Sequence, residues 1–368
     1  MKAVILIGGY GTRPMLLHQV EALMQVTWYF MVAVKFQIDV DEIILAINRQ
    51  AAALEPFIKE SCKSVIRDKD VKITFSYEDE ALDTGNGSSF LFTLPAGPLA
   101  QAAEYLDSDN ESFLVLNSDI ICRYPFKKMI EFHLSHGHEG TMVTKVEEPS
   151  KYGAVVHNDQ TGLVKHFVEK PSEYIANRVN AGLYMFKPSI LSRIQAKPTS
   201  IETSIFPAMV SEGELYCMEL EGFWMDMGQP ADYLTGMRLY LAHLYETKAL
   251  NTDSQYGLIG NVLVDPTAKV GNGCRIGPNV TIGAHVVIED GVRIQNSAIF
   301  SKSVIRSHAW LNNCIVGWRS TVGRWVRMEN TTVLGENVRV KDELFLNGAL
   351  VLPHNAISDS VTEPHIIM

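Results

Sequence analysis

The chain has 368 residues, of which 46% are hydrophobic and 20% are charged, and its formal net charge is −10. This length allows two domains, and the composition is typical of folded globular proteins and excludes a largely disordered chain. The negative charge argues against nucleic acid as the main partner. A local group of cations or a metal ion can still bind an anionic substrate.

The cysteines and the apolar runs predict a cytoplasmic protein that does not enter a membrane. The five cysteines are scattered without a C-x-x-C pair, as is typical of reduced thiols in the cytosol: Cys62, Cys122, Cys217, Cys274 and Cys314. The apolar run at residues 3–7 is shorter than the core of a secretory signal, and the run at 27–34 is too short to cross a bilayer.

Up to about residue 245, short apolar runs alternate with segments of helical periodicity. The predicted strands are 4–7, 42–47, 71–75, 113–116, 140–146, 153–156, 164–168 and 182–186. The predicted helices are 16–25, 52–60, 98–105, 125–136 and 231–244. This alternation predicts an α/β domain over residues 1–245, with a mostly parallel sheet covered by helices. Ligands of such domains bind beyond the carboxyl ends of the strands.

A glycine-rich loop, G-G-Y-G-T-R, follows the first predicted strand. Its glycines allow a tight turn whose successive N–H groups can bind an anion, and Arg13 could neutralise a phosphate. The spacing matches neither the P-loop nor the full dinucleotide-binding pattern. An ordinary tight turn therefore remains an alternative at this point.

Two aspartates follow apolar strands and are candidate metal ligands. Asp119 ends the run F-L-V-L-N-S-D, and Asp226 ends G-F-W-M-D. Mg²⁺ prefers one or two carboxylates together with phosphate oxygens and water, so a shared magnesium site is the prediction. The alternative for Asp119 is a turn or helix-capping role.

Other polar residues between these aspartates could bind a sugar phosphate. Glu169 and Lys170 end a predicted strand, where they could form a solvated ion pair of little consequence. Alternatively, Glu169 accepts hydrogen bonds from sugar hydroxyls and Lys170 holds the phosphate. Asn180 comes before the next predicted strand, and Gly153 is a candidate for close approach of a ligand.

After about residue 251 the sequence changes to a period of six. Apolar residues recur at every sixth position from Val264 to Phe300 and, after a shift, from Val304 to Leu352. This period fits neither an amphipathic helix nor an alternating strand. It is the signature of a hexapeptide parallel β-helix, in which three hexads form one coil. Sixteen hexad positions predict about five coils over residues 251–368.

We interpret this solenoid as a structural or assembly module. The alternative is an acyltransferase, since hexapeptide enzymes place a histidine between stacked subunits. His285, His308 and His354 are the candidates, but the sequence identifies no partner acid for any of them.

These segments, in this order, resemble the sugar-nucleotide pyrophosphorylases, and most closely those that transfer guanylyl groups to mannose 1-phosphate. The resemblance extends over nearly the whole chain. The stretches that carry it are M-K-A-V-I-L-I-G-G-Y-G-T-R, L-L-H-Q-V-E-A-L, F-L-V-L-N-S-D-I-I-C, V-T-K-V-E-E-P-S-K-Y-G, F-V-E-K-P, N-A-G-L-Y, P-T-S-I-E, G-F-W-M-D-M-G-Q-P, I-V-G-W-R, R-M-E-N-T-T-V-L-G-E and L-P-H-N-A-I.

The resemblance implies a nucleotidyltransferase-like (Rossmann-like) domain followed by a left-handed parallel β-helix. It also implies the reaction of GTP with mannose 1-phosphate, in which Mg²⁺ offsets the charge on the leaving diphosphate. The implied metal ligands are Asp119 and Asp226, and the implied catalytic groups are Lys170, Arg13 and Asp119. The sugar phosphate would contact Gly153, Glu169, Lys170 and Asn180, and the nucleotide phosphates would contact Gly8, Gly9, Gly11, Thr12 and Arg13.

The chain departs from the family pattern in three places, all on the nucleotide side. The family's first loop continues to a P-K-P lysine, whereas here Pro14 leads directly to Met15. Residues 26–40 include an insertion, and residues 80–99 replace the segment that approaches the nucleobase. These abrupt junctions suggest a gene-model or splicing error, which sequencing of the transcript would reveal.

The departures leave two readings of the function. The chain is an enzyme, or it is a non-catalytic regulatory subunit that senses a nucleotide sugar, of a kind that the superfamily also contains. Retention of both aspartates favours the enzyme. We expect a homo-oligomer, or a hetero-oligomer with a related regulatory subunit, because solenoid flanks and ends commonly mediate assembly.

Overall fold

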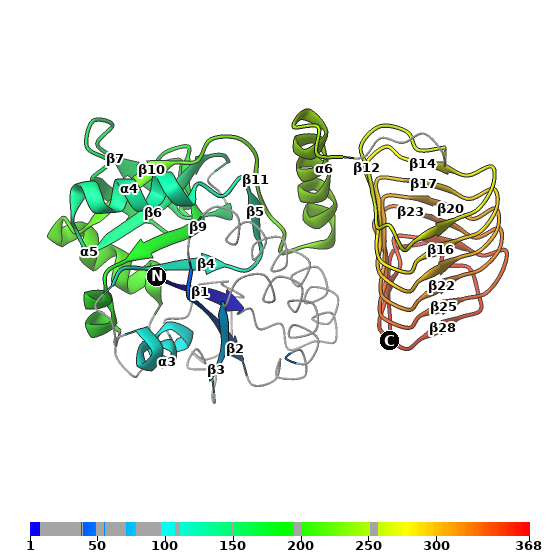
Figure 1. Cartoon of the computed structure of the whole chain (residues 1–368), viewed down its shortest axis with the longest axis horizontal. Coiled ribbons are helices and arrows are strands. Elements are labelled where there is room, and N and C mark those ends of the chain that lie inside the picture. Colours follow the sequence, from blue (N-terminus) through cyan, green and yellow to red (C-terminus); the bar gives the residue numbers. More distant parts are fainter. Residues whose placement is uncertain are drawn as a thin grey trace. The chain divides into compact units, whose positions relative to one another are not determined.

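A computed structural model describes residues 1–7, 38, 40–48, 55, 71–78, 97–106, 111–148, 151–194, 200–250 and 257–368 of the chain. The described residues form two compact units, which divide after Trp224. The first is an α/β unit, and the second contains helix α6 (Pro230–Glu246) and a solenoid of short strands (Figure 1). The sequence placed the end of the first domain at residue 245, and that boundary stays a prediction.

A mixed sheet forms the centre of the first unit. Its strands are β1 (Lys2–Ile7), β2 (Glu42–Asn48), β3 (Lys72–Glu78), β4 (Phe113–Asn117), β6 (Gly140–Val146), β7 (Ala154–His157), β8 (Val164–Val168), β9 (Arg178–Phe186) and β10 (Leu215–Glu219). They follow the order β10-β6-β9-β4-β1-β2-β3, and β7 joins β8 and β9. β1 to β4 run parallel, whereas β9 is antiparallel to β4 and β6.

One hydrophobic core joins this sheet to two of the three α-helices that the structure describes in this unit. The helices are α3 (Gly97–Leu106), α4 (Phe126–His136) and α5 (Phe206–Glu212), of which α3 and α5 contribute to the core. Leu99 of α3, Phe206 of α5 and Tyr184 of β9 all belong to this core and are 1% exposed or less. The continuous apolar runs therefore form strands because both of their faces are buried.

The predicted elements of this unit mostly match the structure, but β9 and several short elements differ. β9 begins at Arg178, four residues before the predicted start, because polar residues at its beginning still pair with β6. The elements that were not predicted are β5 (Ile120–Cys122), β10, α5, the 3-10 helix η3 (Pro188–Arg193) and the π-helix η4 (Ile201–Ile205), whereas β11 (Trp224–Asp226) is the apolar strand expected before Asp226. Most are too short to show a period. The predicted helix 16–25 lies outside the described residues, as does all of 52–60 except Glu55.

The solenoid consists of three parallel sheets of seven, six and five strands. The first contains β12 (Val262–Val264), β15 (Val280–Ile282), β18 (Ser297–Ile299), β21 (Cys314–Val316), β24 (Thr332–Leu334), β27 (Leu350–Val351) and β29 (Ile366–Ile367). The second contains β13 (Lys269–Val270), β16 (Val287–Ile288), β19 (Val304–Ile305), β22 (Thr321–Val322), β25 (Arg339–Val340) and β28 (Ala356–Ile357). The third contains β14 (Arg275–Ile276), β17 (Arg293–Gln295), β20 (Trp310–Asn312), β23 (Arg327–Glu329) and β26 (Phe345–Asn347). This is the predicted left-handed β-helix.

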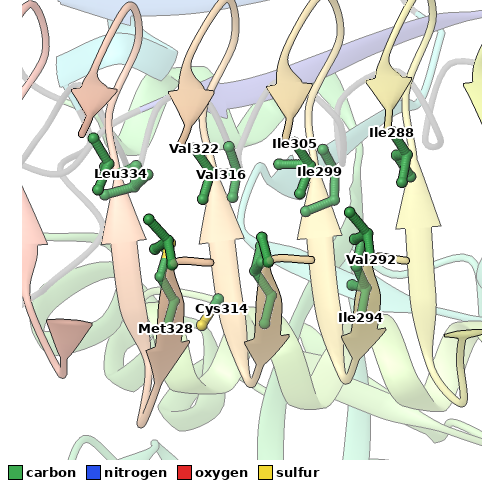
Figure 2. Packing of buried hydrophobic residues seen from close by; sticks show 14 of the residues in the cluster. Ile288, Val292, Ile294, Ile299, Ile305, Cys314, Val316, Val322, Met328 and Leu334 are labelled. Carbon is green, nitrogen blue, oxygen red and sulfur yellow. The ribbon is translucent and has the colours of Figure 1, made fainter. Parts of the chain in front are cut away.

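The sequence predicted a single shift in the six-residue period. In the structure, individual turns of the solenoid are instead shorter by one residue at separate corners. β14 pairs Arg275 with Arg293, 18 residues on, but β17 pairs Arg293 with Trp310, only 17 residues on. Trp310 in turn pairs with Arg327, again 17 residues further along the chain. Two such short turns resemble one larger shift, so the predicted positions Phe300, Val304 and Trp310 were wrong by one residue. A third short turn, in which Leu334 pairs with Val351, makes the predicted Leu352 wrong by one residue as well. The buried core instead contains Ile299, Ile305 and Leu311, the first two of which are labelled in Figure 2.

Asparagines at one corner link successive coils. Asn261 Nδ2 donates to Asn279 Oδ1 at 2.7 Å, Asn279 Nδ2 to Asn296 Oδ1 at 2.9 Å, and Asn296 Nδ2 to Asn312 Oδ1 at 3.1 Å. Asn279 and Asn296 have φ values of 57° and 46°. Asparagine tolerates this left-handed backbone better than most residues, so one residue type provides both the turn and the link.

Helix α6 packs on the solenoid within the second unit. The Tyr233 ring meets Phe300 edge-on at 6.2 Å, and Thr281 Oγ1 donates a hydrogen bond to Met237 Sδ at 3.4 Å. Phe300 is therefore buried against α6, which explains why it looked like a core position in the sequence. Among the helices that the structure describes, none has the length and apolar character needed to span a membrane.

Candidate functional site

Asp119 lies in a turn at the carboxyl end of β4. Ser118 N donates to Leu6 O at 3.2 Å, and this bond holds the turn beside β1. Asp119 is half-buried. Asn117, the last residue of β4, has a buried Oδ1 atom that finds no hydrogen-bond partner within the described part of the chain. This strand end therefore presents oxygen atoms, as the sequence predicted.

Glu169 follows β8 and carries a buried carboxylate with an unsatisfied oxygen. Its side chain is 7% exposed, and its Oε2 atom has no hydrogen-bond partner in the ranges that the structure describes. Lys170 Nζ lies 3.7 Å from Oε1. Burial raises the pKa of Glu169, and the nearby charge of Lys170 offsets this only in part. An unpaired buried acceptor costs stability, and a hydroxyl donor from a ligand would satisfy it.

Lys170 has an unusual backbone conformation, with φ of 44°. Residues other than glycine and asparagine seldom adopt this left-handed region, and such residues cluster at ligand-binding and catalytic sites. The conformation takes the chain out of β8 and leaves the Lys170 side chain 28% exposed. The ammonium group is thus accessible to an anion beside Glu169.

Gly153 lies directly against Glu169. A Cβ atom at this position would be 2.7 Å from Glu169 Oε2 and 2.6 Å from Phe167 Cζ, closer than real Cβ atoms approach. Asn180 N donates to Gly153 O at 2.8 Å, which joins the start of β7 to β9. The absence of a side chain at Gly153 therefore lets the backbone pass close to the Glu169 carboxylate, which would bind the ligand.

Asn180 lies in β9 and is connected to residues that the sequence analysis did not single out. Its Nδ2 donates to Tyr184 Oη at 2.7 Å and to Glu202 Oε1 at 3.3 Å, and its Oδ1 accepts from Gly182 N at 3.1 Å. Tyr184 and Glu202 occur in the stretches N-A-G-L-Y and P-T-S-I-E, which carried the family resemblance without an assigned role.

The predicted residues on the sugar side converge on Tyr184. Burial raises the pKa of the Tyr184 hydroxyl well above its usual value, and the negative charges of Glu202, Glu169 and Asp119 raise it further. Three carboxylates from separate strand ends and a helix are therefore close enough to act on one hydroxyl group. The first unit thus brings Asp119, Gly153, Glu169 and Asn180 into one region.

The raised pKa of Glu169 makes a prediction about stability. In the unfolded chain this carboxyl ionises near its usual pKa of about 4.3. The folded state holds the proton to higher pH, so the penalty of burying the charge grows as pH rises and is fully present above the folded pKa. Glu169→Gln should therefore raise the melting temperature at pH 7, and this gain should disappear when the pH falls below about 4. Calorimetry at both pH values measures it; an equal effect at both would contradict the assignment.

The remaining predicted residues are Asp226 and the glycine loop. Asp226 ends β11 and belongs to the second unit, and its Oδ1 accepts a hydrogen bond from Gly228 N at 2.9 Å. Five predicted nucleotide-binding residues lie outside the described residues: Gly8, Gly9, Gly11, Thr12 and Arg13. Residues 80–96 of the altered segment 80–99 also lie outside them.

The histidines considered for acyl transfer lie at corners of the solenoid. His308 stacks on Trp325 with ring centroids 4.3 Å apart, and His354 Nδ1 lies 3.2 Å from Asn337 Nδ2. His285 N donates to Thr267 Oγ1 at 2.8 Å. Within the described ranges, no three His, Cys, Asp or Glu side chains are grouped so as to hold a metal ion.

Comparison with known proteins covers both units. Residues 2–243 match the family model for nucleotidyl transferase, and residues 258–367 match the one for the GMPPB C-terminal domain. A Drosophila melanogaster protein named mannose-1-phosphate guanylyltransferase catalytic subunit beta is 51% identical over 100% of this chain and 97% of its own. The Danio rerio protein of that name is 51% identical over 100% of both chains. The chain belongs to the mannose-1-phosphate guanylyltransferase family.

This guanylyltransferase family extends to plants. The Arabidopsis thaliana mannose-1-phosphate guanylyltransferase 1 is 46% identical over 100% of both chains. The alignment with the Drosophila relative has 386 positions, whereas this chain has 368 residues, so at least 18 positions have no counterpart here.

Proposed function

We propose that the chain forms GDP-mannose and diphosphate from GTP and mannose 1-phosphate. The observation that carries the proposal is the buried, unsatisfied Oε2 of Glu169, which lies against Gly153 and beside Lys170. A sugar hydroxyl supplies the donor that this oxygen needs, and the Lys170 ammonium can pair with the sugar's phosphate. Similarity to guanylyltransferases over the full chain supports this choice of substrates.

In this proposal the first unit positions the sugar phosphate for in-line attack. Glu169 and Asn180 accept hydrogen bonds from the sugar, and Lys170 holds its phosphate. Fixing the attacking oxygen in this way lowers the entropic part of the barrier. The residues predicted to hold the phosphates of GTP are Gly8, Gly9, Gly11, Thr12 and Arg13.

We assign the metal to Asp119 and Asp226. Asp119 lies in the turn after β4 and Asp226 ends β11, and oxygen ligands of this kind fit Mg²⁺ rather than a softer metal. When bound, Mg²⁺ would offset the charge that develops on the leaving diphosphate. The negative charges of Asp119, Glu169 and Glu202 all act on the Tyr184 hydroxyl, and a cation bound at Asp119 would offset part of this charge.

Location and assembly belong to the same proposal. A cytoplasmic chain agrees with four buried free cysteines, Cys122, Cys217, Cys274 and Cys314. We propose further that the solenoid mediates a homo-oligomer, or a hetero-oligomer with a related regulatory subunit. Measurement of the molecular mass in solution, alone and with such a subunit, would distinguish these assemblies from a monomer.

The reverse reaction tests the proposed substrates. Purified chain, GDP-mannose, diphosphate and Mg²⁺ should give GTP and mannose 1-phosphate in equal amounts, and the reaction should stop when EDTA removes the metal. Chromatography of the nucleotides measures both results. If GDP-mannose stays intact while another nucleotide sugar is consumed, the assignment of guanosine and mannose is wrong.

A further inference from the structure

Asn180 uses most of its hydrogen-bonding capacity inside the protein. A carboxamide has two N–H donors and one oxygen acceptor with two lone pairs. The N–H of Gly182 requires an acceptor, and Asn180 Oδ1 provides it. The two N–H groups of the Asn180 carboxamide therefore point toward Tyr184 and Glu202. With respect to the described residues, one lone pair on Oδ1 is left. Asn180 can therefore accept a hydrogen bond from a sugar hydroxyl but cannot donate one.

Glu202 reaches Asn180 from a separate element. It lies in the π-helix η4, whose first turn is capped by Ser200 Oγ accepting from Thr203 N at 3.2 Å. Glu202 is only 7% exposed. A carboxylate buried this deeply is unfavourable unless its oxygens accept hydrogen bonds, and Asn180 Nδ2 provides one. π-helical turns are also frequent at functional sites.

Tyr184 is the third member of this network. Its Oη accepts from Asn180 Nδ2 at 2.7 Å, so the hydroxyl acts as an acceptor toward the carboxamide. The charges of Glu202, Glu169 and Asp119 all act on this hydroxyl, which burial keeps in its protonated form. Tyr184 thus keeps its hydroxyl proton at physiological pH, and Oη stays an acceptor for Asn180.

We propose that Glu202 is a positioning residue for the sugar. Together with Tyr184 it fixes the carboxamide of Asn180, so that Oδ1 faces the sugar beside the unsatisfied Oε2 of Glu169. This inference rests on the proposed function and adds to it two residues that act through Asn180. It also predicts that substrates are recognised here by their hydroxyl donors.

Separate titrations of mannose 1-phosphate and GTP into the full chain test this role by calorimetry. Glu202→Gln exchanges one acceptor oxygen for a donor, so we expect it to weaken binding of mannose 1-phosphate about tenfold, the effect of losing one hydrogen bond to a charged group. GTP affinity should stay within about twofold. Tyr184→Phe should have a similar effect. The double variant should lose no more than either single variant, because both act through Asn180.

Glu139→Gln is the matched control. Glu139 is also 7% exposed, and it pairs with Arg193 at 2.5 Å rather than with any residue of the sugar site. If Glu202→Gln leaves the affinity for mannose 1-phosphate unchanged, or if Glu139→Gln lowers it equally, Glu202 has no positioning role and the proposed function stands. If the wild-type chain binds no mannose 1-phosphate, the proposed function fails and the inference fails with it.

Discussion

Replacing Asp119 by asparagine should lower the rate of diphosphate release by at least about a hundredfold, the effect of removing one preorganised transition-state contact. Asparagine keeps the shape of the side chain but removes the charge that would hold Mg²⁺. Because the sugar site retains Glu169, Lys170 and Asn180, the affinity for mannose 1-phosphate should change little. Initial rates over a range of Mg²⁺ concentrations, with calorimetry for binding, measure the two effects separately.

Asp159→Asn is the control for loss of a negative charge. Asp159 follows β7, and its side chain is 87% exposed. The control should keep the wild-type rate. If Asp119→Asn turns over as fast as the wild type, the metal assignment is wrong; if it also loses sugar affinity, Asp119 acts on the sugar rather than on the metal.

Replacing Gly153 by alanine should weaken mannose 1-phosphate binding by more than about tenfold and also destabilise the fold by about 1–3 kcal/mol through overpacking. The added Cβ would overlap Phe167 Cζ at 2.6 Å and Glu169 Oε2 at 2.7 Å. The Glu169 carboxylate is the more flexible of these neighbours, so it should move and lose its position for the ligand. Calorimetric titration and thermal unfolding measure the two consequences.

Gly140→Ala separates the two consequences. A Cβ at Gly140 would lie 2.6 Å from Met209 Cε, the same shortest distance as at Gly153 but to the flexible end of a side chain. Gly140 pairs with Phe186, at the opposite end of β9 from Asn180. The control should therefore lose stability but keep its affinity for the sugar phosphate. If both variants bind mannose 1-phosphate equally well, Glu169 does not bind the sugar.

The sequence predicted the architecture well where its pattern was periodic. A six-residue period identified the β-helix, because one buried residue per face is a constraint that every coil repeats. The exact register depended on corners shortened by one residue, and a buried Phe300 hid the first of them. Phe300 lies outside the core of the coil and packs against Tyr233 of α6 and Trp318, and contacts with residues distant in the sequence leave no local signal.

The sugar side of the site was predictable from where polar residues follow apolar strands. Glu169 and Asn180 stood out because charged and amide groups at strand ends point to a ligand. Tyr184 and Glu202 did not, since a tyrosine in a buried strand and a glutamate after a loop are ordinary in isolation. Their roles depend on the fold of β9 and η4, which brings three side chains to one carboxamide.

The residues proposed to bind the sugar phosphate and those proposed to bind the nucleotide therefore differ in how closely they follow the family pattern. The sugar half has intact motifs and a network of buried hydrogen bonds around Asn180. The nucleotide half carries all three departures from the family pattern, at residues 14–15, 26–40 and 80–99. Sequencing the transcript across codons 10–20, 26–40 and 82–96 checks whether these departures are present in the natural protein. An uninterrupted match to this sequence would contradict a gene-model or splicing error.

Diphosphate release by the purified chain with GTP, mannose 1-phosphate and Mg²⁺ tests the central claim most directly. We predict release that requires both substrates and the metal, with GDP-mannose formed in equal amount. Absence of release, together with measurable binding of GDP-mannose, would contradict catalysis and identify the chain as a regulatory subunit.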